Sequence, residues 1–441
     1  MNRRLALVCA VSGGLVVLQQ QWLLRRPPRL LELVPDTIHS GTAAVEVRFS
    51  RPMHRRNVAS ESQLDPDLTH RWHASGQALG LVIENEQPLK TPVLISLAGR
   101  DLRMQSMTPQ NRWWDPRPWL VVNRSVEGGD QLQLLQRDGT WRPITPIWPA
   151  ITQMEPLGDG RGIAVVSSDD SGRERIWLQH LQRRGIQPQR HLLDAPARGS
   201  LQPLIEGKLL FGHLSSNLNG DLLVQSGGLK PGSEAVELIQ NDGQRRPLSI
   251  KSSGPLQLLP VGGGVVVPTF DGLRLQPLIN GTPESSQMLP GSRELGAFCH
   301  ASGRAVLIRH WPDYRRSIEL VMPGLPPRQL HLGDQAVLAV ACNNTGTTIW
   351  AVLGRWTSQG RQQTIVLMNE MGQIQRQQQL NPWLLQPGTR LLLDPVGQQL
   401  LMSVNQSPNK LTGRTALMDS TTLEWREIGE TAIKEAVWLS P

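Results

Sequence analysis

The stretch LGDGRGIAVVSSDDSGRERIWLQHLQRRG, residues 157–185, determines how the rest of the chain is interpreted. An apolar run at 163–166 is followed by a polar turn around Gly172 and by a second apolar run at 176–181. Short apolar runs separated by turns rich in Gly, Asp and Ser are typical of antiparallel strands. The stretch therefore predicts two neighbouring strands of one sheet, with a glycine turn at each end.

Copies of this pattern recur from about residue 110 to the C-terminus. One signal is a strand, a two-residue turn and a polar strand, and it occurs seven times. Glycine suits such turns because it adopts positive φ without steric cost. The turn glycines are Gly139, Gly185, Gly243, Gly281, Gly324 and Gly372. The seventh copy has Thr422-Leu423 at this place instead.

A second signal consists of two apolar strands around a glycine turn. Examples are MEPLGDGRGIAVVSS (154–168), LQPLIEGKLLFGH (201–213) and LQLLPVGGGVVVPTF (256–270). It precedes six of the seven copies of the first signal, which gives four strands in each unit. Four-stranded repeats with a period of about 45 residues are typical of β-propellers. Residues 109–441 are therefore predicted to form a seven-bladed β-propeller.

The clearest unit resembles the repeat of TolB-like (WD40-like) propellers. Gly158-Asp159-Gly160 stands where that repeat has Pro-Asp-Gly, and Trp177 stands where it often has Tyr. The other units depart further, since the segment from Cys299 to Gly303 keeps only the glycine. The resemblance implies an exported protein-binding module, although related propellers also act as gates on serine oligopeptidases.

The last ten residues, AIKEAVWLSP (432–441), match the start of the second signal but stop at its turn. The first unit, which begins WWDPRPWLVV (113–122), has no clear innermost strand of its own. We therefore predict that Ala436 to Leu439 form this strand beside Leu120 to Asn123. The two ends of the propeller would then be joined and the ring closed.

Residues 31–108 contain short strand patterns and no helical period, which predicts a small β-sandwich. In AAVEVRFS (43–50), apolar and polar residues alternate. The stretch VEVRFSRPMHRRNV (45–58) resembles a bacterial Ig-like domain of surface and envelope proteins, which usually serves as a spacer or adhesion module. His70 and His73 are spaced as a metal pair on a helix, but in a strand they point to opposite faces, so we expect exposed polar histidines.

The N-terminal segment, residues 1–30, has the features of a targeting sequence. Arg3 and Arg4 precede an uncharged run from Leu5 to Leu18, which is the length of a signal-peptide core. An uncleaved signal anchor is the preferred interpretation, and a cleaved signal peptide or a buried helix are the alternatives. The expected location is the periplasm or cell envelope, with the chain anchored to the inner membrane.

Charge and cysteine content limit the partners and the compartment. The net charge of +8 is spread along the chain, which supports a modest preference for anionic partners. Nucleic acid fits this charge but not the expected export, so it is not the expected partner. Cys299 and Cys342 occupy matching positions in neighbouring units. Two buried thiols are the preferred interpretation, because neighbouring blades could hold the two Cα atoms too far apart for a disulfide.

Catalytic and metal-binding motifs are missing from the sequence. There is no G-x-S-x-G, Walker, C-x-x-C, H-E-x-x-H or EF-hand pattern, and the glycine-rich VGGGVVV (261–267) reads as a hairpin. No enzyme activity, cofactor or metal is therefore expected. The alternative is a propeller enzyme of hydrolase or lyase type, whose site would assemble across blades in the central channel.

A binding face is expected where the loops between the second and third strands of the blades gather. Three of these loops, 309–316, 354–362 and 405–414, are basic and contain aromatic residues, a combination that suits carboxylates, phosphates or sugar rings. The predicted partner is an envelope protein, a peptide or an anionic glycan, and an ordinary solvated face or a scaffold surface is the alternative. The candidate residues are Arg309, Trp311, Tyr314, Arg315, Arg316, Arg355, Trp356, Arg361, Lys410 and Arg414.

Overall fold

The computed structural model describes residues 26–441 except 38–39, 85–86, 206, 279–285, 359, 408–409 and 411. Of the first 25 residues it describes only Ser12, Gly14 and Gln19. Most of the expected signal anchor, residues 1–30, and the expected turn glycine Gly281 thus lie outside the described residues. Within the described part of the chain, no helix combines the length and apolar character needed to span a bilayer.

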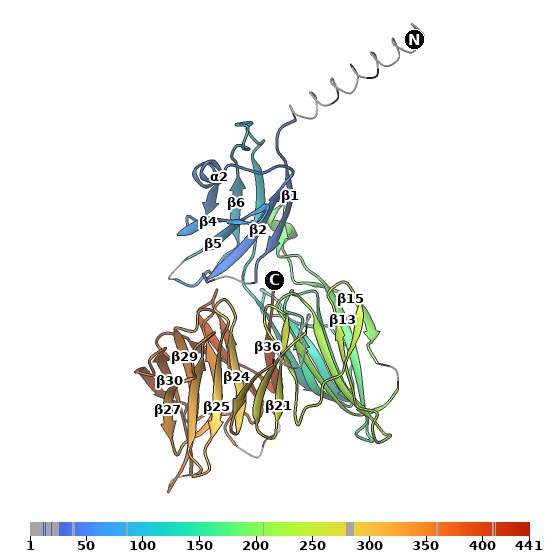
Figure 1. The fold of residues 1–441 in the computed structure, drawn as a ribbon, viewed down its shortest axis with the longest axis vertical. Helices are drawn as coiled ribbons and strands as arrows, with labels where there is room; N and C mark the ends of the chain where they lie inside the picture. Colours follow the sequence, from blue (N-terminus) through green and yellow to red (C-terminus); the bar gives the residue numbers. More distant parts are fainter. Residues whose placement is uncertain are drawn as a thin grey trace.

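The N-terminal domain consists of two four-stranded antiparallel sheets that enclose one core (Figure 1). Its buried centre includes Val45, Leu81, Ile95 and Trp114, which come from both sheets. One short helix is added at α2 (Arg55–Glu61). The first sheet has the order β1 (Leu30–Pro35), β2 (Ala43–Phe49), β5 (Ala78–Ile83), β4 (His70–Ser75). The second has the order β14 (Ile186–Gln187), β7 (Gln110–Trp114), β6 (Val93–Leu97), β3 (Gln63–Asp65).

Two strands of the second sheet change the predicted domain organisation. The boundary between the two domains was expected before residue 109. Because β7 pairs with β6, the strands of the N-terminal domain extend to Trp114. β14 belongs to an excursion of the second propeller blade and pairs with β7 at Ile186–Trp114. The turn expected at Gly185 is therefore wrong, because the chain leaves the blade there to complete the sheet of the other domain.

The two histidines of the H-x-x-H motif lie in β4. His70 Nδ1 is 2.7 Å from the carbonyl oxygen of Leu68. The His73 ring packs against Gly80, where a Cβ atom would lie only 2.1 Å from His73 Cε1. Among the described residues, no group of three potential metal ligands is found.

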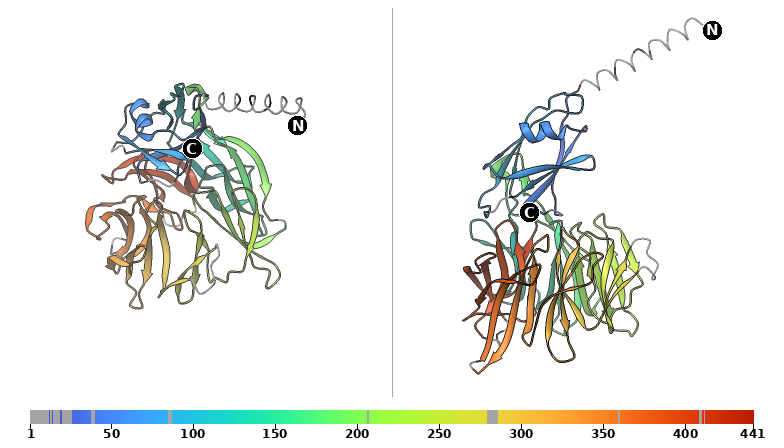
Figure 2. Two further views of the ribbon diagram at one scale, coloured as in Figure 1. Left: turned by 45° about the horizontal axis from the view of Figure 1, so that its top comes forward. Right: turned by 60° about the vertical axis from the view of Figure 1, so that its left-hand side comes forward.

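The rest of the chain is a β-propeller, whose four-stranded antiparallel blades stand around a common axis (Figure 2). Blade one contains the end of β36 (Trp425–Leu439) with β8 (Trp119–Val126), β9 (Gly129–Leu135) and β10 (Trp141–Pro143). Blade two contains β11 (Ala150–Pro156), β12 (Gly162–Ser168), β13 (Glu174–Gln182) and β15 (Ala197–Pro203), with a 3₁₀ turn η1 (Arg190–Leu192) in its excursion. Blade three contains β16 (Leu209–Ser216), β17 (Leu222–Gly228), β18 (Ala235–Ile239) and β19 (Arg245–Leu248).

The following blades have the same order of strands from the axis outward. Blade four contains β20 (Gln257–Leu258), β21 (Gly264–Thr269), β22 (Gly272–Pro277) and β23 (Gln287–Pro290). Blade five contains β24 (Arg293–Cys299), β25 (Arg304–His310), β26 (Arg316–Val321) and β27 (Arg328–Gly333). Blade six contains β28 (Ala336–Cys342), β29 (Thr348–Thr357), β30 (Gly360–Asn369) and β31 (Ile374–Gln379). The last blade contains β32 (Leu384–Leu385), β33 (Leu392–Asp394), β34 (Gln399–Asn405), β35 (Gly413–Asp419) and the start of β36.

The expected closing strand is confirmed by the pairing of β36. Its first part pairs with β35, and its last part pairs with β8 from Ile433–Arg124 to Leu439–Trp119. Ala436 faces Val122, and Val437 faces Val121, as the split motif predicted. One continuous strand therefore links the last blade to the first.

The turn positions of the repeat are also found. Gly139, Gly243, Gly324 and Gly372 all have positive φ, between 72° and 88°. Leu423, at the corresponding place of the seventh copy, has a φ of 61° and is fully buried. Leu423 thus has a backbone conformation that is unfavourable for leucine, and its side chain is buried in the core of the last two blades.

The strand assignment of the third blade differs from the prediction. LQPLIEGKLLFGH (201–213) is not a hairpin within one blade, because Leu201 to Pro203 end the outer strand β15 of blade two. Leu209 to His213 instead begin the inner strand β16 of blade three. The second strand of this blade is β17, which follows β16 after a short turn.

The two cysteines form a disulfide, so the expectation of two buried thiols is wrong. Cys299 and Cys342 have Cα atoms 5.6 Å apart. The inner strands β24 and β28 approach closely because Gly296 has no side chain. A Cβ atom at this position would lie only 2.1 Å from Val340 Cγ2. The bridge therefore joins the last residues of the inner strands of blades five and six.

Candidate binding face

The second-to-third strand turns of the blades lie at the end of the propeller that the N-terminal domain leaves uncovered (Figure 1). We call this end the distal face. The N-terminal domain instead contacts first-to-second strand turns: Thr37 Oγ1 donates to the Leu218 carbonyl at 3.4 Å, and the Leu89 N–H to the Val396 carbonyl at 3.0 Å. The loops chosen from the sequence therefore belong to the free end.

In blade five, Trp311 is held by its own neighbours. The Arg309 guanidinium carbon lies 3.7 Å from the centre of the Trp311 ring, and Trp311 Nε1 donates to the buried Ser317 Oγ at 2.9 Å. Arg309 also pairs with Glu319, at 3.5 Å. Trp311 and Arg309 thus stabilise the turn, and each has one side already occupied.

Tyr314 is presented outward at the tip of the same turn. Its residue surface is 86 % exposed and its φ is 65°. The hairpin is closed by a hydrogen bond from the Trp311 N–H to the Arg315 carbonyl at 3.0 Å. Arg315 pairs with Asp313 at 2.7 Å, and Arg316 Nη1 donates to the carbonyls of Tyr314 and Arg315. These arginines are fixed beside the ring and still have N–H donors for a ligand.

Blade six presents a second ring at the equivalent place. Trp356 is 74 % exposed, and the guanidinium carbon of Arg361 lies 4.7 Å from its ring centre. The two residues face each other across β29 and β30. Arg355 Nε donates to Gln362 Oε1 at 2.9 Å. The structure thus joins Arg355, Trp356 and Arg361 in one hairpin.

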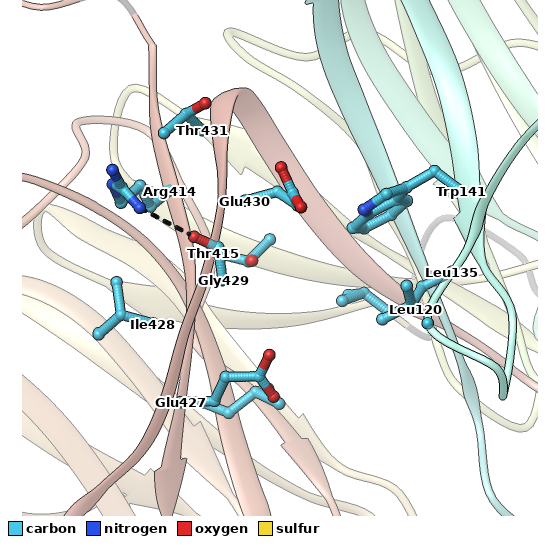
Figure 3. Close-up of a pocket in the computed structure, with 12 residues that line it drawn as sticks. Leu120, Leu135, Trp141, Arg414, Thr415, Glu427, Ile428, Gly429, Glu430 and Thr431 are labelled. Carbon is cyan, nitrogen blue, oxygen red and sulfur yellow. Dashed lines mark hydrogen bonds between the residues drawn. The ribbon is translucent and has the colours of Figure 1, made fainter.

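The two residues expected from the last blade do not join these rings in the same way. Lys410 is exposed in a partly described turn, where its N–H donates to the Ser407 carbonyl at 3.2 Å. Arg414 Nη1 donates to the Gly429 carbonyl at 3.3 Å. It lines a separate groove of about 410 Å³ between the last and first blades (Figure 3). Arg414 therefore lines this groove, and its expected place in the binding face stays a prediction.

This groove is lined by acidic as well as apolar side chains. Figure 3 shows Glu430 directed toward Trp141, with Leu120 and Leu135 on the same side. Glu430 is already paired with Arg124, at 3.1 Å. The groove thus follows from the geometry of the ring closure, where β36 crosses from one blade to the next.

One exposed ring was not recognised as a site residue from the sequence. Phe270, in the turn between β21 and β22 of blade four, is 97 % exposed. Its loop was among those expected on the distal face, but the turn is short and lacks arginine. The available signal was positional: the second-to-third strand turns of three consecutive blades each contain an aromatic residue.

A cluster of charged side chains lies around the axis, on inner strands and on the segment that precedes β33. Arg390 Nη1 is 3.0 Å from Glu155 Oε2, and Arg390 Nη2 is 3.5 Å from Glu435 Oε1. Burial raises the pKa of Glu435 against the opposing attraction of Arg390. Burial lowers the pKa of the neighbouring His213, and the positive charge of Arg390 adds to this. These groups come from several blades and are bound mainly to one another.

Comparisons with known proteins bear on the fold. No family model and no curated protein matches the chain. An uncharacterized protein from Listeria monocytogenes EGD-e is similar over 72 % of this chain and 93 % of its own, with a TM-score of 0.50 and 11 % identity. TolB from Acinetobacter baumannii is similar over 80 % and 81 %, at a TM-score of 0.41 and 13 % identity. The β-propeller domain of the Trilobed protease from Pyrococcus furiosus is similar over 80 % and 95 %, at 0.44 and 12 %. At such identities the likeness concerns the fold and not the ligand or partner.

Proposed function

We propose that this chain is a non-catalytic exported or envelope protein that binds a protein, a peptide or an anionic glycan through the distal face of its propeller. The observation that carries this proposal is the exposure of Tyr314 and Trp356 beside Arg315, Arg316 and Arg361. Exposed rings next to guanidinium groups suit ligands that combine flat apolar surface with negative charge. The N-terminal domain contacts the opposite end and leaves this surface accessible.

We further infer a seven-bladed ring, with the N-terminal domain as an Ig-like spacer between the propeller and a membrane anchor at residues 1–30. The Cys299–Cys342 disulfide supports export, because disulfides persist in oxidising compartments such as the periplasm. The propeller would then work in the periplasm or cell envelope, held at the inner membrane. Its partners would be envelope components rather than nucleic acid.

The competing function is a propeller enzyme with its site around the axis. A cluster of candidates on the axis side of the blades is formed by Glu155, Glu435, Arg390 and His213. A general acid or base must reach a substrate proton, yet Glu155 is already bound by Arg390 and by the Ser216 N–H at 3.1 Å. We therefore interpret this cluster as a link between blades.

The proposal is tested by recovering partners from envelope fractions with the full chain as bait. The wild type is compared with Arg315→Ala/Arg316→Ala/Trp356→Ala, and with Leu325→Ala/Arg376→Ala as the control. Both control residues are exposed in blades five and six, away from the distal face. We expect the first variant to lose partners that the control retains. Equal recovery by all three proteins would contradict the proposed face.

A further inference from the structure

Three consecutive blades each present one exposed aromatic ring at or beside the turn between their second and third strands. Phe270, Tyr314 and Trp356 lie at the second-to-third strand turns of blades four, five and six. Figure 1 shows β21, β25 and β29, which lead into these turns, following one another around the propeller. A single exposed ring needs no explanation, but an exposed ring repeated at one end of three neighbouring blades points to a binding surface.

The turns hold their rings outward by regular hydrogen bonding. In blade four, Thr269 Oγ1 donates to the Gly272 carbonyl at 3.0 Å, and in blade six Thr357 Oγ1 donates to the Gly360 carbonyl at 2.9 Å. Both glycines have positive φ, 142° and 106°. The matching T-x-x-G turns place Phe270 just after the threonine and Trp356 just before it. The backbone of these two turns is therefore held in place before a ligand arrives, which lowers the entropic cost of binding.

The charges around Tyr314 and Trp356 favour an anionic ligand. Arg315 and Arg316 follow Tyr314 directly, while Arg355 and Arg361 flank Trp356. Asp313 offsets part of this charge by pairing with Arg315. The remaining guanidinium donors can bind carboxylate, sulfate or phosphate groups in a bidentate manner.

We propose that these three turns form a track for an anionic polysaccharide, with sugar rings stacked on Phe270, Tyr314 and Trp356 and its acidic groups bound by the neighbouring arginines. This inference rests on the proposed function and names the class of ligand for the same face. One ring on each of three neighbouring blades offers a repeated apolar surface, which a polymer of sugar rings can follow.

An acidic peptide fits these turns less well. Addition of a peptide strand requires unpaired backbone groups at a sheet edge, but these hairpins pair internally, as at Trp356–Arg361 and Thr357–Gly360. Docking of a helix requires a continuous apolar groove, whereas the three rings stand on separate turns. The polysaccharide is therefore the occupant that the geometry favours.

The test measures binding of the full chain to polygalacturonic acid and dextran sulfate by calorimetry, with neutral dextran and poly-L-glutamate as comparison ligands. Phe270→Ala/Tyr314→Ala/Trp356→Ala removes the rings, Arg315→Gln/Arg316→Gln removes charge, and Leu325→Ala is the control on the opposite end of blade five. All of these side chains are exposed or half-buried, and melting curves verify that each variant is folded.

We expect the wild type and Leu325→Ala to bind at least one of the acidic polysaccharides, and dextran more weakly. Both distal-face variants should bind at least about tenfold more weakly, and added salt should weaken wild-type binding. Binding that is unchanged in the ring variant would overturn the proposal. Tighter binding of poly-L-glutamate than of either polysaccharide would also overturn it, and would assign the face to acidic peptides. If no polysaccharide binds while envelope partners still depend on Arg315, Arg316 and Trp356, the glycan assignment falls and the proposed face stands.

Discussion

Deleting residues 432–441 tests how the propeller ring is closed. In the structure, Ile433 to Leu439 form the inner strand of the first blade and pair with β8 from Arg124 to Trp119. The deletion removes this strand while leaving the part of β36 that completes the last blade. It therefore exposes the backbone edge of β8 and opens the link between the first and last blades.

The expected loss of stability follows from what the segment buries. Ile433, Val437 and Leu439 are all at most 2 % exposed. Burial of one such side chain stabilises a fold by about 1.5–3 kcal/mol, so the three together contribute about 5–9 kcal/mol. Lys434 is also lost, and with it the 2.7 Å ion pair to the buried Asp130. A typical domain is stable by only about 5–15 kcal/mol, so the deletion should unfold the propeller rather than shorten a tail.

The assay is thermal unfolding, followed by near-ultraviolet circular dichroism and by calorimetry. Deletion of residues 440–441 alone is the matched control, because it removes the hydrogen bond from Ser440 Oγ to the Gly158 carbonyl but leaves the strand intact. We expect the control to melt near the full chain and the longer deletion to lack a cooperative transition. A peptide of residues 432–441 added in trans should restore part of the signal. If the longer deletion melts like the full chain, the closure has no energetic role and the reasoning is refuted.

Four further predictions concern the ring and its junction with the N-terminal domain. Reducing the Cys299–Cys342 disulfide, whose cysteines are 43 residues apart, should cost about 4 kcal/mol of unfolding free energy by loop-closure entropy; equal denaturation midpoints with and without dithiothreitol would contradict this. Arg390→Met should cost about 1–3 kcal/mol, since the guanidinium is partly exposed and its attraction is screened. Burial raises the pKa of Glu435 above its ordinary value of 4.5, so its ionisation in the folded protein lowers the free energy of unfolding as the pH rises above 4.5. In urea titrations between pH 5 and 8, the free energy of unfolding of Glu435→Gln should therefore fall less than that of the wild type. Ile186→Lys should separate β14 from β7 and make residues 183–196 the first site of trypsin cleavage, whereas unchanged digestion would show that β14 does not hold the domains together.

The repeat could be predicted from the sequence because its signals are local. Turn residues and alternating apolar runs report the conformation of their own few residues, so positive φ at Gly139 or Gly243 was foreseeable. Even the closing strand could be deduced, because an unfinished motif at 432–441 matched a missing one in the first unit. These are arguments about the chain itself, without knowledge of its distant contacts.

The errors arose where the outcome depends on distant partners. An apolar–glycine–apolar pattern looks the same whether its turn lies within one blade or between two, and LQPLIEGKLLFGH (201–213) proved to be the second kind. Ile186 pairs with Trp114 of the other domain, which no local pattern indicates. The disulfide likewise required the close approach of β24 and β28 at Gly296.

The candidate site was predictable in part for the same reason. Tyr314 and Trp356 could be selected from the sequence because each lies in a loop that also contains arginines. The structure adds that both side chains are exposed. The sequence could not show that Trp311 is held by Arg309 and Ser317. Whether an aromatic side chain covers a turn or faces solvent depends on its rotamer and on its neighbours in space, and the amino-acid sequence does not show either.

The N-terminal domain docks on the end of the propeller opposite the distal face, so the distal face points away from this domain. β14 and Val396 of the propeller both reach this domain, the first by strand pairing and the second by packing into its core. Figure 1 shows β1 beginning at the end of the domain that is far from the propeller. If residues 1–30 anchor the chain as proposed, the propeller stands one domain away from the bilayer with its exposed rings directed outward. The arrangement favours ligands beyond the membrane surface, because a lipid headgroup would lie behind the domain that separates it from Tyr314 and Trp356.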